Sequence, residues 1–206
     1  MFDGIPKWFI ENHWCNGDSE VPDLPVDLVI MISYGAYKSG GLAQLTKATS
    51  AITHRACEIA KAHTEAVVVA SPCKYLFPGS DRDERALRDN IACDYEVSPF
   101  WAEGMLNSVD EGLKLLKLIL TRGIRAEHTV IVTGQSHSRF VRWLYGSLLV
   151  GCTITVICVP FETEYQADHR AKMQRTAWRW IIATFERHLA FAFLGRRIAK
   201  IHHSVD

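Results

Sequence analysis

Four short runs of apolar, β-branched residues, separated by stretches of helical periodicity, constrain the fold of this chain more than any other feature. The runs are residues 27–33 (DLVIMIS), 66–71 (AVVVAS), 129–134 (TVIVTG) and 153–160 (TITVICVP). Each is nearly continuous in apolar residues rather than alternating, which is typical of strands covered by helices on both faces. The runs therefore predict a parallel sheet that lies inside the domain.

Between these runs, apolar residues recur at spacings of three and four, as in amphipathic helices. This pattern covers residues 43–63, 108–122 and 136–149, and an aromatic stretch at 168–194 predicts a C-terminal helix. Strands that alternate with helices form parallel sheets with right-handed crossovers. We therefore predict an α/β fold: a three-layer α/β/α sandwich with a mainly parallel, Rossmann-like sheet.

The length of 206 residues predicts a single domain spanning 1–206. Residues 1–26 form an N-terminal extension that precedes the first predicted strand. Residues 72–106 stand where one crossover helix is expected, but are longer, rich in proline and glycine, and contain a run of charges. A connection of that length is typical of a functional insertion or lid, with a surface excursion as the alternative.

Charge and targeting features narrow the function classes. Lys plus Arg and Asp plus Glu both number 23, whereas non-specific nucleic-acid and anionic-membrane binders carry a basic excess, so neither partner is expected. The N-terminus resembles no signal peptide, and no apolar window is long enough for a membrane span. The six cysteines contain no C-x-x-C pair. These features predict a cytoplasmic protein with reduced thiols.

A small-molecule ligand is expected at the carboxyl ends of the strands, where helix N-termini present free N–H groups. Ser33 and Gly35 follow the first strand in a glycine-rich loop that is neither G-x-G-x-x-G nor a P-loop. Ser71 ends the second strand and Thr133 lies at the end of the third. These residues are the predicted hydrogen-bonding groups of the site.

The loop after the third strand carries the most chemistry. His137 falls at the start of a helix, where the positive end of the helix dipole favours neutral imidazole, a form that accepts a proton. Arg139 and Arg142 lie three residues apart on one face of that helix, a spacing suited to an anion. The alternatives are a capping role for His137 and a solvated face for the two arginines.

The segment Asn107-Ser108-Val109-Asp110-Glu111 opens the helix at 108–122. Ser108 and Glu111 match the S-x-x-E capping box, which satisfies backbone N–H groups and needs no function. The competing interpretation places Ser108 and a carboxylate, Asp110 or Glu111, beside the ligand.

Taken together, these pieces resemble the YdcF/SanA/ElyC family of Rossmann-like domains. Asn107, Ser108 and Asp110 resemble the family's N-T-x-E with conservative replacements, and Glu111 stands in place of its final Asn. Thr133 and His137 keep the spacing of T-S-x-x-H, and Arg55 resembles the Arg of the first helix. The chain departs from the pattern at Ser71-Pro72-Cys73, where the family has Ser-Gly-Gly. Arg139 comes one position early for the family's last Arg and Arg142 two late.

The resemblance implies a soluble, YdcF-like member, and it makes S-adenosylmethionine a candidate cofactor. The leading hypothesis is a transferase or hydrolase that acts on a small, polar, anionic metabolite. His137 is the expected acid/base, with Asp110 or Glu111 as a second. Arg55 and Arg139 are expected to bind the anion.

Two alternative functions remain open, a serine hydrolase and a non-catalytic module. A serine hydrolase would use Ser136 of Gly134-Gln135-Ser136-His137-Ser138, with Glu162 or Asp168 and with His169 or His188 as triad partners. A non-catalytic ligand-binding module would bind without turnover.

The aromatic C-terminal helix is expected to cover the core, with a homodimer face as the alternative. No spacing supports a metal site.

Overall fold

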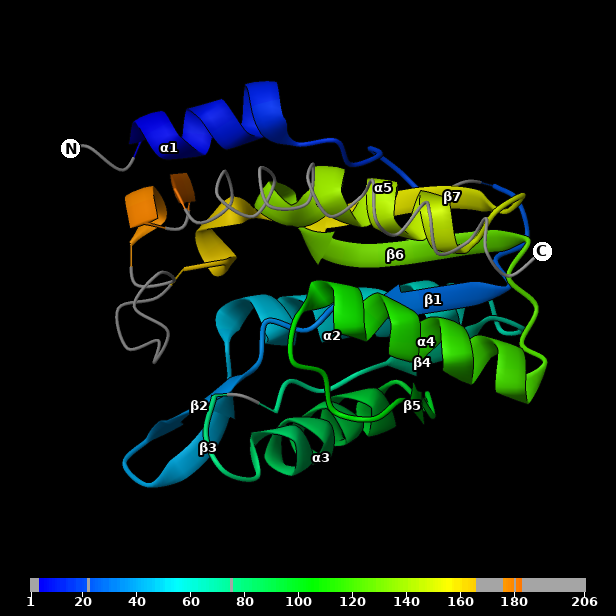
Figure 1. The fold of residues 1–206 in the computed structure, drawn as a ribbon, viewed down its shortest axis with the longest axis horizontal. Helices are drawn as coiled ribbons and strands as arrows, with labels where there is room; N and C mark the ends of the chain where they lie inside the picture. Colours follow the sequence, from blue (N-terminus) through cyan, green and yellow to red (C-terminus); the bar gives the residue numbers. More distant parts are fainter. Residues whose placement is uncertain (1–3, 22, 75, 166–175, 180, 183–206) are drawn as a thin grey trace, which may run out of the picture.

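A parallel sheet forms the centre of the molecule, seen in a computed structural model that describes residues 4–21, 23–74, 76–165, 176–179 and 181–182. Its strands are β1 (Leu28–Met31), β4 (Val67–Ala70), β5 (Phe100–Trp101), β6 (His128–Gly134) and β7 (Thr153–Val159). Their order across the sheet is β5-β4-β1-β6-β7, and every pair is parallel (Figure 1). This is the strand order of a Rossmann-like fold, in which the connection changes direction beside the first strand.

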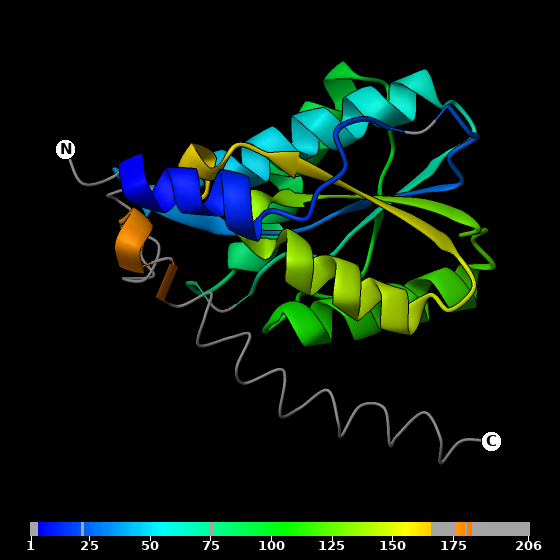
Figure 2. The ribbon, with the colours of Figure 1, turned by 90° about the horizontal axis from the view of Figure 1, so that it is seen from above.

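Helices cover both faces of the sheet. α2 (Lys47–Ala62) and α3 (Ser80–Asp94) lie on one face, and α4 (Ser108–Arg122) and α5 (Ser138–Leu148) lie on the other (Figure 2). The central strands β1 and β6 are almost wholly buried, as the continuous apolar runs predict. The prediction of a three-layer α/β/α sandwich is confirmed.

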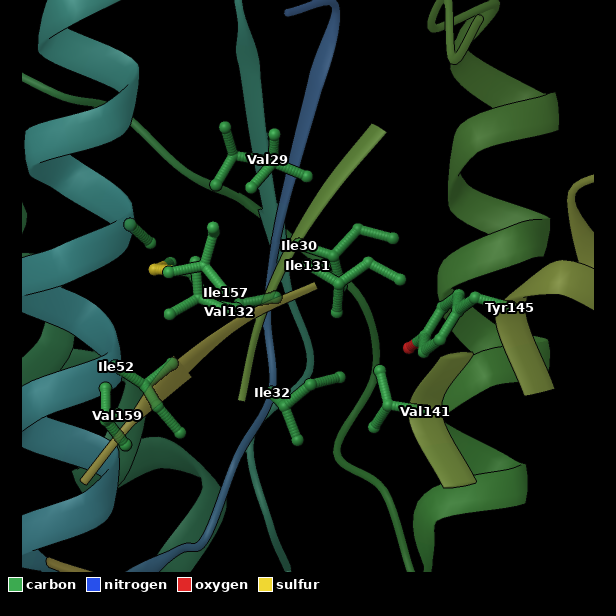
Figure 3. Close-up of a cluster of buried hydrophobic side chains, with 14 of the residues drawn as sticks. Val29, Ile30, Ile32, Ile52, Ile131, Val132, Val141, Tyr145, Ile157 and Val159 are labelled. Carbon is green, nitrogen blue, oxygen red and sulfur yellow. The ribbon is translucent and has the colours of Figure 1, made fainter. Parts of the chain in front are cut away.

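The core follows from the alternation of side chains along each strand (Figure 3). Ile52 of α2 meets Val159 of β7 on one side of the sheet. Ile131 of β6 points to the opposite side, towards Val141 and Tyr145 of α5. Packing on both faces fixes the position of β1 and β6, and therefore of the loops that leave their carboxyl ends.

The segment 72–106 is part of the sheet rather than an insertion or lid. It contains α3, fifteen residues long, and β5, which pairs in parallel with β4. It is therefore an ordinary crossover helix followed by an edge strand. The strand was hidden from sequence analysis because it is two residues long and neither of its side chains is fully buried.

A two-stranded hairpin stands in place of the glycine-rich loop predicted after the first strand. β2 (Ala36–Ser39) pairs antiparallel with β3 (Leu42–Leu45), and Gly40 and Gly41 form the turn with φ of 57° and 83°. Positive φ at both central residues is the geometry of a two-residue hairpin turn, which glycine adopts without strain. α2 therefore begins at Lys47, capped by Thr46, and not at residue 43.

The N-terminal segment, residues 4–21, packs along β7. It forms α1 (Gly4–Phe9) and a short π-helix, η1 (Ile10–Trp14), and Asp18 then bridges to Ile157. None of the helices within the described residues is long and apolar enough to span a membrane. The predicted helix at 168–194 lies outside the described residues, except for 176–179 and 181–182, where Ala177 and Ile181 are buried.

Candidate functional site

The carboxyl ends of β1 and β6 define the switch point of the sheet. Connections leave β1 towards one face and β6 towards the other, and open α/β folds bind their ligands beyond the strands at such a switch point. Ser33 and Tyr34 follow β1 at this edge, and Ser136 and His137 follow β6 in a single 3-10 turn, η2 (Gln135–His137). The four residues place hydroxyl groups and an imidazole on adjacent loops.

Ser33 bonds to carboxyl groups from both faces of the sheet. Its backbone N–H donates to Glu111 Oε1 of α4 at 3.1 Å, and its hydroxyl donates to Glu84 Oε1 of α3 at 2.6 Å. Both glutamates are buried, at 1% and 0% exposed. The end of β1 is thus fixed between two acidic side chains that contact no bulk water.

Glu84 is the better neutralised of the two. Arg88, one helical turn further along α3 and also 0% exposed, donates to Glu84 Oε1 at 3.0 Å, and the N–H of Cys73 donates to Oε2 at 2.8 Å. Burial raises the pKa of Glu84, while Arg88 and these donors favour the charged form.

Glu111 has less compensation. Burial raises the pKa of the Glu111 carboxyl to about 8, and the Ser33 N–H and the charge of Arg88 offset only part of that effect. A carboxyl group with this pKa carries a proton at neutral pH and exchanges it within the physiological range. Perturbed acids of this kind are typical of functional sites.

Ser108 and His137 are in contact at the switch point. Ser108 Oγ lies 3.1 Å from His137 Nε2, and His137 is only 6% exposed, beside the rings of Tyr34 and Phe140. Ser108 and Glu111 are three residues apart on α4 and therefore share the helix face that points to the sheet edge.

The predicted capping box is wrong. Asn107 is the N-cap of α4, and its side chain accepts from the N–H groups of Val109 and Asp110 at 3.0 Å. Because Asn107 supplies the cap, the Ser108 hydroxyl group is left to contact His137. The Glu111 carboxyl group accepts from the N–H of Ser33. The competing interpretation, which placed Ser108 and a carboxylate, Asp110 or Glu111, beside a ligand, stays a prediction.

A third buried carboxyl group, Glu164, secures the loop after β6. It accepts from the Ser136 N–H at 2.9 Å, from the Ser136 hydroxyl, and from the Tyr34 hydroxyl at 3.1 Å. Gly134 is required here, because a Cβ would lie 2.5 Å from the Tyr34 hydroxyl oxygen. Tyr34 and Ser136 are thereby held in fixed positions next to His137.

Ser136 lacks the geometry of a nucleophile elbow. Such an elbow holds its serine in a strained turn, but Glu96 is the one non-glycine residue with positive φ in the described part of the chain. The Ser136 side chain is fully buried and committed to Glu164. Glu162 forms an ion pair with Lys7 at 2.7 Å, and Asp168, His169 and His188 lie outside the described residues.

The predicted anion-binding arginines are engaged elsewhere. Arg55 lies midway along α2 and pairs with Glu58 at 3.0 Å. Arg139 donates to the carbonyl oxygens of Trp14 and His13, and Arg142 pairs with Asp18 at 2.6 Å. The Arg139 and Arg142 side chains therefore attach the N-terminal segment to α5.

The remaining predicted residues play supporting roles. Asp110 accepts from Lys114 Nζ and from the Leu106 N–H, both at 2.8 Å. Ser71, fully buried, donates to the carbonyl oxygen of Glu103, and Thr133 is fully buried beneath the loop. Gly35, with φ of 83°, donates its N–H to Ser33 Oγ at 3.0 Å.

Four residues that contact the candidate site were not predicted from the sequence: Tyr34, Glu84, Arg88 and Glu164. A signal for two of them was present: Ser80, Glu84, Arg88 and Ala92 recur every four residues and are the buried face of α3. A polar stripe at helical spacing looks like a solvated surface unless a partner for it is known. Tyr34 and Glu164 gave no local signal, because their contact joins segments 130 residues apart.

The described residues contain no cluster of three or more His, Cys, Asp or Glu side chains arranged to hold a metal ion. Comparison of the chain with family models, with curated proteins and with solved structures gives no match.

Proposed function

We propose that this chain is an enzyme that transfers a proton to or from a small, polar, anionic metabolite at the carboxyl ends of β1 and β6. The observation that carries the proposal is the 3.1 Å contact between Ser108 Oγ and His137 Nε2 at the switch point of the sheet. A histidine whose ring is oriented by a neighbouring hydroxyl and largely withdrawn from water is suited to general acid/base catalysis.

Ser108 sets the orientation of His137 and shares its proton. The ring stands in T-shaped contact with Tyr34, at 6.1 Å between centroids, and 5.1 Å from Phe140, so the imidazole has little freedom to rotate. In this proposal His137 exchanges the proton with the ligand, and Ser108 is a positioning residue.

Glu111 is the second group that holds a proton. Its raised pKa, about 8, makes it a proton donor near neutral pH, and it accepts from the backbone N–H of Ser33 at the switch point. Asp110 is less suited to this role because its carboxylate is committed to Lys114 and to the Leu106 N–H. Of the two predicted carboxyl groups, we therefore assign the role to Glu111.

The anionic character of the ligand rests on backbone groups, since Arg55 and Arg139 have other partners. The N-termini of α2, α4 and α5 all lie at this edge of the sheet, and helix N-termini attract phosphate and carboxylate groups. Nucleotides, sugar phosphates and S-adenosylmethionine are the candidate classes. The likeness to the YdcF/SanA/ElyC family, part of this proposal, agrees with them.

A thermal-shift screen of the purified chain against these classes and against divalent metals tests the proposal. A ligand at 100 times its Kd should stabilise the fold by about 2.7 kcal/mol. We expect a hit that is retained in His54→Ala, an exposed histidine of α2, and weakened at least tenfold in His137→Ala and Ser108→Ala. A hit of unchanged affinity in both site variants would overturn the assignment.

A further inference from the structure

Cys15 and Cys158 are brought into contact by the packing of the N-terminal segment on β7. They are 143 residues apart in the sequence, yet their sulfur atoms lie 3.7 Å apart. The main chain fixes this approach, because the Asp18 N–H donates to the Val156 carbonyl oxygen at 2.7 Å and Asp18 bridges to Ile157. A Cβ at Gly17 would collide with Cys158 Sγ, so the chain passes directly over that sulfur.

The start of α5 provides a polar environment for Cys15. Ser138 Oγ lies 3.9 Å from Cys15 Sγ, accepts from the Asn16 N–H at 2.8 Å and donates to the Gln135 carbonyl oxygen at 2.8 Å. The contact with Cys158 lowers the pKa of Cys15 to about 6, with further contributions from Ser138 and Arg139, and raises the pKa of Cys158. The lowered pKa makes Cys15 the better nucleophile of the two, and the raised pKa makes Cys158 the candidate resolving cysteine.

We propose that Cys15 and Cys158 form a redox-active pair, which closes to an intramolecular disulfide when the protein meets a small-molecule disulfide. Both side chains are partly exposed, so an oxidant of this size has access to Cys15. The sulfur atoms must approach by about 1.7 Å, from 3.7 Å to a bond of about 2.05 Å.

The oxidation proceeds in two balanced exchanges. The Cys15 thiolate attacks one sulfur of the disulfide RSSR, forming Cys15–S–S–R and releasing RS⁻, which takes up a proton from water. Cys158 then loses its proton and attacks Cys15 Sγ, forming the Cys15–Cys158 bond and releasing the second RS⁻, which that proton converts to a thiol. Overall, two protein thiols are oxidised, and one RSSR is reduced to two RSH.

The disulfide would fix the N-terminal segment against the loop that carries His137. Trp14, next to Cys15, donates its indole N–H to the Ser136 carbonyl oxygen at 2.8 Å, and Arg139 holds the carbonyl oxygen of Trp14. A bond at Cys15 therefore acts on the residue that precedes His137. The pairing of the two cysteines does not depend on the proposed enzymatic function.

The test is to treat the full chain with oxidised glutathione, denature it, alkylate its free thiols and measure its intact mass by mass spectrometry. The chain has six cysteines, so the reduced protein takes up six alkyl groups and the oxidised protein should take up four. Digestion should yield one peptide pair joined through Cys15 and Cys158, which disappears on reduction.

Three single variants make the test specific. Cys93→Ser, which removes an exposed thiol, should still lose two alkylation sites on oxidation. Cys15→Ser should lose none, and Cys158→Ser should carry glutathione on Cys15. Six alkyl groups on the oxidised wild-type chain, glutathione retained on wild-type Cys15, or a loss of two sites in Cys15→Ser would overturn the proposal.

Discussion

The backbone N–H of Ser33 donates to the buried carboxyl group of Glu111 at 3.1 Å, which joins the carboxyl end of β1 to the first turn of α4. The same residue contacts Glu84 through its hydroxyl group. Helices from opposite faces of the sheet therefore converge on one position at the switch point.

Glu111 should make stability depend on pH. Its pKa is about 8 in the folded chain against an ordinary value of 4.5, so between these pH values the folded chain binds a proton that the unfolded chain has lost. The free energy of unfolding contributed by Glu111 is therefore largest below pH 4.5 and falls as the pH rises to about 8, by up to about 1.4 kcal/mol per pH unit.

Glu111→Gln removes this titration and keeps an oxygen to accept from Ser33. We expect urea unfolding at pH 5, 6, 7 and 8 to show that the variant gains stability over the wild type as the pH rises. Glu20→Gln, at an exposed position, should stay within about 0.5 kcal/mol of the wild type throughout. A difference between Glu111→Gln and the wild type that is constant with pH would contradict the account.

The pair Glu84–Arg88 should be strongly coupled. Both side chains are 0% exposed, so Arg88→Met leaves an unpaired carboxyl group in the interior and should cost about 3–5 kcal/mol in chemical denaturation. Glu84→Gln with Arg88→Met should cost less than the sum of the two single changes. Arg82→Met, on the exposed side of the same helix, is the control and should cost less than about 0.5 kcal/mol. A double variant whose loss of stability equals the sum of the losses in the two single variants would argue against the pairing.

Two buried tyrosines should respond oppositely to loss of the hydroxyl group. The Tyr145 hydroxyl has no hydrogen-bond partner within the described residues, so Tyr145→Phe should leave the free energy of unfolding unchanged or raise it by about 1 kcal/mol. The Tyr34 hydroxyl donates to Glu164, and Tyr34→Phe should lower that energy by about 1–3 kcal/mol. Thermal and urea unfolding of the two variants measure these free energies. An equal loss of stability in Tyr34→Phe and Tyr145→Phe would contradict the prediction.

Ser136 should not behave as a nucleophile. Its hydroxyl group is buried and donates to Glu164, so a serine-directed fluorophosphonate probe should leave it unlabelled. Ser136→Ala should lower stability by about 1–3 kcal/mol, because Glu164 then loses a donor. Labelling of Ser136, abolished in this variant, would restore the hydrolase alternative.

The layers of the fold were predictable because the sheet is buried on both faces. The helix predicted at 108–122 coincides with α4 (Ser108–Arg122), where Asn107 marks the start and Gly123 ends it with φ of 61°. The hairpin of β2 and β3 escaped because its half-exposed strands lack an apolar run. β5 escaped because two residues cannot show a period.

The site was predictable only in part, since its residues come from distant segments. The sequence pointed to Ser33, Ser108, Glu111 and His137 as edge residues, and the structure brings Ser33 to Glu111 and Ser108 to His137. Arg139 has the positive charge expected of an anion-binding residue, but its guanidinium group donates to carbonyl oxygens of the N-terminal segment. No local sequence pattern predicts that contact. Glu84 and Arg88 are charged residues, which in a sequence indicate an exposed helix face. They are buried because they form an ion pair with each other, and the sequence does not reveal that pair.

The most direct test of the central claim is turnover of the ligand identified by the thermal-shift screen, followed by mass spectrometry with the wild type and with His137→Gln. The glutamine retains a polar contact with Ser108 but cannot transfer a proton. We expect the wild type to convert the ligand, and His137→Gln to bind it with conversion reduced at least a hundredfold. Equal conversion by both proteins, or binding without conversion by the wild type, would contradict it.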